Sequence, residues 1–262
     1  MALLRRVLLV LASLAVAVLP DGCSQKAPSW VVFVLFDISG STSAPEIRQR
    51  YFRDFQKILE AMQGGGLLMC DVITENTLAT SNPIEAFFPA YNPLIDNPLS
   101  HKKKLQKITE QMLVEAKKLI LETPPAPMTD LMNSFQLASK IFNGERCKGA
   151  GGKALVVFSD MIEQSRNYDF QKLRLTEERT QQIIETERRD GRLPNLSGVK
   201  VWVSGATAAK KGGVSPKKIY QIQNFWLHYF QACGADLTSE RYATTLINFE
   251  LPPIPGQNAG GK

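Results

Sequence analysis

Oxygen-bearing side chains alternate along one short stretch of the sequence, in the order Asp37, Ser39 and Ser41. Side chains at every second position of an extended chain lie on one side, so these three can turn toward one point. Mg²⁺ binds about six oxygen ligands in an octahedral arrangement, and carboxylates and hydroxyls supply such ligands. The stretch therefore predicts a site for a hard divalent cation, provided that other segments add further oxygens.

An apolar run comes directly before this stretch. Residues Trp30–Phe36 are apolar throughout, as expected for a central strand of a parallel sheet that is covered on both faces. Similar runs predict strands over 67–73, 153–158, 199–203 and 244–249, and a short antiparallel edge strand over 84–88. Helices are expected over about 43–62, 100–121, 129–143, 170–190 and 215–233. This order predicts an α/β fold with a doubly wound, mostly parallel six-stranded sheet and helices on both faces.

The oxygen-rich stretch lies where such a sheet binds ligands, beyond the carboxyl ends of its strands. Ser43 and Glu46 have the spacing of a capping box, which predicts Ser43 as the N-cap of the first helix. Asp37, Ser39 and Ser41 are then left without a capping role. They are the first candidates for cation binding.

Asp-x-Ser-x-Ser at the end of an apolar first strand resembles the signature of the von Willebrand factor A (vWA) family, and the similarity covers residues 30–250. The family completes a metal-ion-dependent adhesion site with a threonine from a second loop and an aspartate after the fourth strand. The matching positions here are Thr129 and Asp160, although Met161 stands where the family commonly has glycine. The resemblance implies Ser39, Ser41 and Thr129 as direct ligands. It implies Asp37 and Asp160 as direct or water-mediated ligands.

The resemblance also implies a function. In the family, the open position of the cation accepts a carboxylate from a partner protein, so we expect a non-enzymatic protein-binding module that uses Mg²⁺, with Mn²⁺ or Ca²⁺ possible. Two alternatives stay open, a metal-dependent hydrolase on a similar sheet and a scaffold lipoprotein with an unused pocket. The hydrolase ranks lower because His101 and His228 are the two histidines and neither has a catalytic setting. Thr129 could also serve only as a helix N-cap, and Asp160 as an ordinary loop acid.

The N-terminal segment has the pattern of an export signal. Arg5 and Arg6 precede the apolar run Val7–Leu19, which predicts a signal peptide over 1–22. Cys23 follows Gly22 in a context that resembles a lipobox, so we expect a lipidated protein anchored to a membrane and facing the periplasm or the exterior. The alternative is cleavage nearby with an unmodified cysteine. A linker is expected over 23–29 and a disordered tail over 251–262.

The formal net charge is +6. Export and the scattered placement of the lysines argue against nucleic acid as a binding partner. They favour binding to an anionic membrane surface or to an acidic partner protein in the cell envelope or outside the cell. Lys210 and Lys211 follow the fifth expected strand, at the cation edge. They could steer an acidic partner toward the cation, or they could be solvated loop charges.

Two cysteines are expected at the opposite edge of the sheet. Cys147 precedes the strand at 153–158, and Cys233 ends the last expected helix. Because export permits oxidation, we predict a disulfide between Cys147 and Cys233. Cys70 falls within a strand and is expected to be a buried free thiol.

Overall fold

The computed structural model describes residues 27–206 and 214–252, and these build one mixed sheet of six strands. The strand order is β3-β2-β1-β4-β5-β6. All neighbouring strands are parallel except β2 and β3, which are antiparallel at one edge. The strands are β1 (Trp30–Asp37), β2 (Gly66–Ile73), β3 (Ile84–Phe88), β4 (Gly152–Phe158), β5 (Val199–Ser204) and β6 (Tyr242–Ala243). The α/β fold with an antiparallel edge strand is therefore confirmed.

The order of the strands reverses at one place. Chain connections run from β1 outward to β2 and β3, and then return to β4 on the other side of β1. The crevice at the carboxyl ends of β1 and β4 is therefore the topological switch point, where open α/β sheets bind their ligands. The last residue of β1 is Asp37, and Ser159 and Asp160 follow β4.

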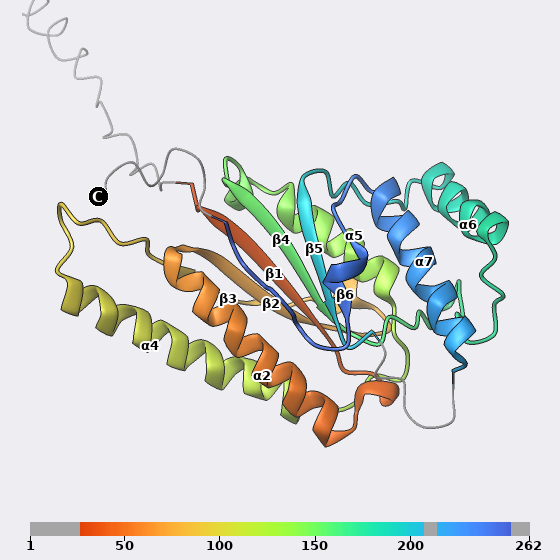
Figure 1. Ribbon diagram of the computed structural model, residues 1–262, viewed down its shortest axis with the longest axis horizontal. Coiled ribbons are helices and arrows are strands. Elements are labelled where there is room, and N and C mark those ends of the chain that lie inside the picture. Colours follow the sequence, from red (N-terminus) through yellow and green to blue (C-terminus); the bar gives the residue numbers. More distant parts are fainter. Residues whose placement is uncertain (1–26, 207–213, 253–262) are drawn as a thin grey trace, which may run out of the picture.

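Helices cover both faces of the sheet (Figure 1). One face packs against α2 (Pro45–Ala61) and α4 (Pro98–Lys117), and the other against α5 (Leu131–Phe142), α6 (Glu177–Arg189) and α7 (Pro216–Ala232). Short helical segments connect these elements: Gly40–Thr42, Met62–Gly64, α3 (Thr77–Thr80), Lys118–Glu122, Glu145–Cys147 and Ser239–Arg241. Strand β1 is buried along its whole length. Its alternate side chains enter the two cores, as the unbroken apolar run predicts.

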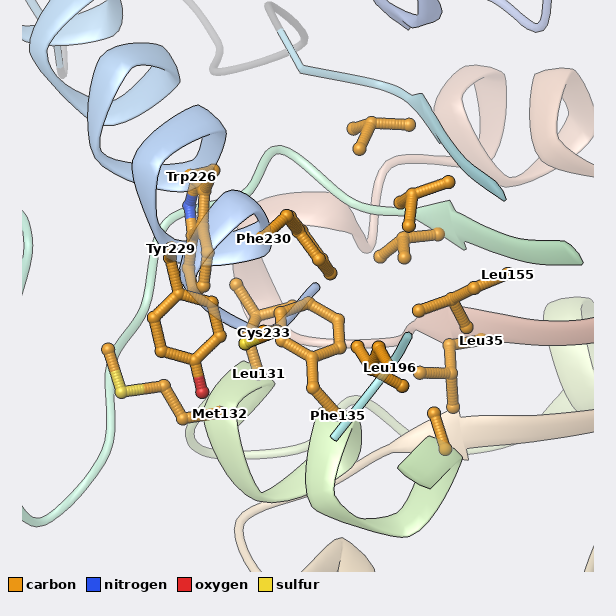
Figure 2. Packing of buried hydrophobic residues seen from close by; sticks show 14 of the residues in the cluster. Leu35, Leu131, Met132, Phe135, Leu155, Leu196, Trp226, Tyr229, Phe230 and Cys233 are labelled. Atoms are coloured by element: carbon orange, nitrogen blue, oxygen red, sulfur yellow. The ribbon is translucent and has the colours of Figure 1, made fainter. Parts of the chain in front are cut away.

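Aromatic side chains fill the core between α5 and α7. Figure 2 shows Trp226, Tyr229 and Phe230 of α7 beside Phe135 of α5. The ring centroids of Phe135 and Trp226 lie 5.4 Å apart in an edge-to-face arrangement. The Trp226 indole N–H donates to the carbonyl oxygen of Met161, at 2.8 Å. This core therefore makes direct contact with the loop that follows β4.

Three expected elements differ from the structure. The helix expected over 170–190 begins at Glu177. Ser43 is not the N-cap of the first helix: Ala44 holds that position, and the Ser43 hydroxyl donates to the carbonyl oxygen of Gly40 in the preceding turn. The expected strand over 244–249 is also absent, and β6 is limited to Tyr242–Ala243. After β6 the backbone N–H of Leu246 donates to the buried carboxylate of Asp54 on α2, so the chain leaves the sheet edge and packs beneath the helix.

The predicted disulfide is also wrong, because Cys147 and Cys233 are both buried free thiols. Cys147 ends a short helical turn ahead of β4, whereas Cys233 caps α7 and accepts a hydrogen bond from the backbone of Leu196 ahead of β5. The two cysteines therefore lie in different connections of the sheet. Cys70 is a buried free thiol within β2, as expected.

Several expectations lie outside the described residues: the export signal over 1–22, the lipidation of Cys23, the steering role of Lys210 and Lys211, and the tail from residue 253 onward. Within 27–206 and 214–252, no helix combines the length and apolar character needed to cross a membrane.

Candidate metal centre

Three loops meet at the switch point and hold one another through their backbones. The turn after β1 pairs with the loop before α5, where the N–H of Ala126 donates to the carbonyl oxygen of Ile38 at 3.0 Å. The same loop pairs with the segment after β4, because Thr129 and Gln164 exchange two backbone hydrogen bonds of 3.0 and 2.9 Å. The loops that carry the predicted ligands are therefore fixed relative to one another.

Asp37 is buried at the centre of this arrangement and has a dense set of partners. Its Oδ1 accepts from the backbone N–H of Ser39 at 2.9 Å, and its Oδ2 accepts from the Ser159 hydroxyl at 2.6 Å. The Thr42 hydroxyl donates to its backbone carbonyl oxygen at 2.7 Å. Burial raises the pKa of Asp37, and the hydrogen bonds from Ser159 and Ser39 act in the opposite direction. The carboxylate is therefore rigidly oriented.

The predicted hydroxyl ligands lie side by side along a cavity. The Oγ atoms of Ser39 and Ser41 are 3.1 Å apart. Both residues and Thr129 line a cavity of about 370 Å³, together with Gly40, Pro125, Ala126, Pro127, Ile162, Gln164 and Gln171. Ser39 and Thr129 are buried, whereas Ser41 is exposed. The cavity is thus lined by hydroxyl oxygens and is open to solvent beside Ser41.

Asp160 has a buried carboxylate oxygen that a cation could satisfy. Its Oδ1 accepts from the backbone N–H of Ile162 at 3.0 Å, whereas its Oδ2 is buried without a hydrogen-bond partner. Burial and the charge of Asp37 raise the pKa of Asp160 to about 7, and the Ser41 hydroxyl acts in the opposite direction. A buried carboxylate oxygen without a partner is costly. A cation would satisfy it and offset the repulsion from Asp37.

Thr129 has no capping role. Asp130 is the N-cap of α5, and its side chain accepts from the N–H of Asn133 at 3.1 Å. Glu163 satisfies two more amides of this helix end, because its Oε2 accepts from the N–H groups of Leu131 and Met132 at 2.8 and 3.3 Å. The alternative in which Thr129 serves only as a helix cap is therefore wrong.

Met161 holds an unusual backbone conformation directly after Asp160. Its φ angle is 63°, in the left-handed region that glycine adopts without strain. Its N–H donates to the Ser159 hydroxyl at 2.9 Å, and its carbonyl oxygen accepts from Trp226. The loop therefore needs the conformation that glycine favours, and the neighbouring hydrogen bonds hold methionine in it.

The sequence did not single out four residues that support this site. Ser159 and Thr42 orient Asp37, Glu163 secures the start of α5, and Arg48 donates to the carbonyl oxygens of Ile38, Ile120 and Thr123 at 2.9–3.2 Å. Ser159 and Thr42 stand next to the predicted ligands in the sequence, and that proximity was the available signal. Arg48 and Glu163 act through contacts with distant segments, which no local pattern reveals.

The donor set fits a cation that prefers oxygen. It offers the carboxylates of Asp37 and Asp160 and the hydroxyls of Ser39, Ser41 and Thr129, which are ligands typical of Mg²⁺ or Mn²⁺. Across the part of the chain that the structure describes, no group of three or more His, Cys, Asp or Glu side chains could hold a metal ion. The hydroxyls therefore distinguish this candidate from a site built on acids, histidines or thiols.

Comparisons with known proteins concern the fold alone. No protein-family model matches the sequence, and no curated protein matches it. Among solved structures, the pilus adhesin SpaC from Lactobacillus rhamnosus GG in an open conformation is similar, with 13% identity and a TM-score of 0.41 over 84% of this chain. A von Willebrand factor type A structure from Catenulispora acidiphila is similar over 78% of this chain, with 11% identity and a TM-score of 0.37. The alignments cover 28% and 42% of those chains.

Proposed function

We propose that this protein is a protein-binding module that holds a divalent cation, Mg²⁺ or a similar ion such as Mn²⁺ or Ca²⁺, at the switch point of its sheet. Asp37, Ser39, Ser41, Thr129 and Asp160 are the proposed ligands. The observation that carries the proposal is the buried Oδ2 of Asp160, which has no hydrogen-bond partner. The Asp160 carboxyl lies close enough to Asp37 and to the cavity-lining hydroxyl of Ser41 for both to shift its pKa. The proposed partner is an acidic group on another protein of the cell envelope or outside the cell.

The chemistry of the ligands supports recognition of an acidic group. When bound, the cation supplies a positive charge that a partner carboxylate can approach from solvent beside Ser41. Ser39, Ser41 and Thr129 are neutral donors, so they leave more of that charge available than carboxylates would. Asp37, oriented by Ser39 and Ser159, is the fixed part of the site.

We propose a binding role rather than a catalytic one. The residues that line the cavity include no histidine, cysteine or lysine, and the carboxylates of Asp37 and Asp160 are assigned here to the cation rather than to proton transfer. The cavity of about 370 Å³ lies at the small end of ligand pockets, which suits a side-chain carboxylate with its waters. Export and attachment to a membrane through Cys23 belong to the same proposal.

Calorimetric titration with Mg²⁺ tests the cation site. Wild type should bind the ion and gain thermal stability, because a ligand that binds only the folded state stabilises it. Ser39→Ala should lose most of this effect. Ser43→Ala is the matched control, since Ser43 is exposed nearby and its hydroxyl donates to Gly40. Equal Mg²⁺ binding by wild type and Ser39→Ala would rule out the proposed ligand set.

Pull-down from envelope extracts tests the recognition role. Partners captured by wild type should be lost when a chelator is added and when Asp37 is replaced by Ala. Capture that is unchanged by both treatments would point to a scaffold whose cation pocket is unused. Turnover of phosphoester or ester substrates that depends on Asp37 would instead favour the hydrolase alternative.

A further inference from the structure

The end of the sheet opposite the candidate site carries exposed apolar side chains. The loop from β3 to α4, residues 89–97, is here called the tip, and it extends from the left end of the molecule in Figure 1. Leu94 is 90% exposed and Ile95 is 81% exposed. Leu99, in the first turn of α4, is 63% exposed. Single apolar residues are common on surfaces, but a group on one projecting loop indicates a contact surface.

Hydrogen bonds within the tip hold Leu94 and Ile95 outward. The Asn92 side chain accepts from the N–H of Leu94 at 3.0 Å, and its carbonyl oxygen accepts from the N–H groups of Ile95 and Asp96 at 3.2 and 2.8 Å. The Asp96 carboxylate accepts from the N–H of Asn92 at 2.7 Å. The tip therefore satisfies these amides itself, which lowers the cost of moving it out of water.

Positive charge flanks the apolar tip. Lys102, Lys103, Lys104 and Lys107 follow it on α4 and are exposed. Between residues 89 and 107, all of which the structure describes, Asp96 is the one acidic residue. Apolar side chains beside a cluster of lysines are typical of surfaces that lie in the interface of an anionic bilayer.

We propose that the tip is a membrane-contacting surface, in which Leu94 and Ile95 enter the headgroup region of an anionic bilayer and the α4 lysines contact the headgroups. The path of the chain supports a membrane as the binding partner of the tip. Ala27, Pro28 and Ser29 line the same cavity of about 1060 Å³ as the tip, so the sequence before residue 27 joins the domain here. Attachment of that sequence to a membrane would hold the tip against the lipid. The inference is independent of the proposed cation site.

Tryptophan fluorescence in the full chain tests the proposal. Leu94→Trp is mixed with phosphatidylglycerol vesicles whose acyl chains carry bromine, a short-range quencher. Val114→Trp is the matched control, because Val114 is 57% exposed near the other end of α4. The native residues Trp30, Trp202 and Trp226 are buried and give a constant background. Quenching reports the depth of the introduced tryptophan side chain. Attachment of the N-terminal segment to the vesicle would be common to both variants, so it does not decide the comparison between positions 94 and 114.

We expect quenching at position 94 to exceed quenching at position 114 by about twofold or more, since interfacial residues enter the acyl boundary. Zwitterionic vesicles, high salt, or Lys103→Glu in the Leu94→Trp background should each reduce it. Equal quenching at the two positions overturns the proposal. So does a dimer in light scattering that dissociates on Leu94→Ser, because the tip would then bind a second copy of the chain.

Discussion

Asp160 and Asp37 place two carboxylates in one buried site, and this makes stability depend on pH. The pKa of Asp160 is about 7 in the folded protein, because of burial and the charge of Asp37, against an ordinary value of 3.8. The folded state therefore holds the proton more tightly than the unfolded chain. The free energy of unfolding then falls as pH rises from about 4 to about 7. Burial raises the pKa of Glu163 to about 8, so Glu163 lowers the free energy of unfolding further as the pH rises to about 8.

Asp160→Asn should reduce this dependence on pH. Without divalent cations, we expect wild type to be about 6 kcal/mol less stable at pH 8 than at pH 5, because Asp160 and Glu163 each contribute about 3 kcal/mol. The Asn variant should show about half of that loss, because its amide oxygen can still accept from Ile162 while the charge is gone. Chemical denaturation at both pH values measures the difference. A variant with the wild-type pH dependence would show that Asp160 does not titrate as described.

Glu163→Gln tests whether the response to Mg²⁺ is specific to Asp160, because Glu163 is a neighbouring buried acid that is not a proposed ligand. Its amide oxygen can still accept from the N–H groups of Leu131 and Met132, so it should fold and should also show a weaker pH dependence. Mg²⁺ should stabilise Glu163→Gln at pH 8 as it stabilises wild type, but should not stabilise Asp160→Asn. The same response to Mg²⁺ in both variants would exclude Asp160 as a ligand. Thermal unfolding with and without the ion measures this.

At the scale of elements, Arg48 connects helix α2 to two loops of the site. Its guanidinium donates to Ile38 after β1 and to Ile120 and Thr123 before α5. Arg48→Met should cost about 2–4 kcal/mol of folding free energy, because it leaves carbonyl groups without donors. It should also weaken Mg²⁺ binding by about tenfold, since ligand loops that move lose affinity.

Arg53→Met is the control for that change, since Arg53 is exposed on the same helix. It should leave both stability and Mg²⁺ binding close to wild type. Denaturant unfolding and calorimetry measure the two quantities. If Arg48→Met lost stability but bound Mg²⁺ as tightly as wild type, Arg48 would be a structural residue without a role in positioning the site.

Elements defined by local patterns were predictable, and those set by distant contacts were not. The apolar run 30–36 and the run 84–88 correspond to β1 and to the antiparallel edge strand β3, because strands that are buried in a sheet have a recognisable pattern of apolar residues in the local sequence. The apolar residues within 244–249 have another role: Leu246 and Phe249 pack in the core under α2. Likewise, Asp37 was visible in its motif, whereas Arg48 acts on the carbonyl groups of Ile120 and Thr123, which lie 72 and 75 residues away in sequence.

At the scale of the whole molecule, the sheet separates the two proposed surfaces. Strand β1 runs from the edge near the tip to Asp37, and its eight residues span roughly 26 Å. A protein lying on a bilayer through the tip would therefore present the cation site away from the lipid, where a partner protein can reach it. The tip and the proposed cation site then lie at opposite ends of the sheet.

The two surfaces should behave independently, because substitutions that far apart usually have additive effects. Leu94→Ser should leave the stabilisation by Mg²⁺ at the wild-type value. Conversely, Asp37→Ala in the Leu94→Trp background should leave quenching by brominated lipid unchanged. Thermal unfolding and fluorescence on the same set of single and double variants measure both effects. Coupling between them, seen as lipid quenching that changes with Mg²⁺ in Leu94→Trp but not in the double variant with Asp37→Ala, would mean that the sheet transmits cation binding to the tip.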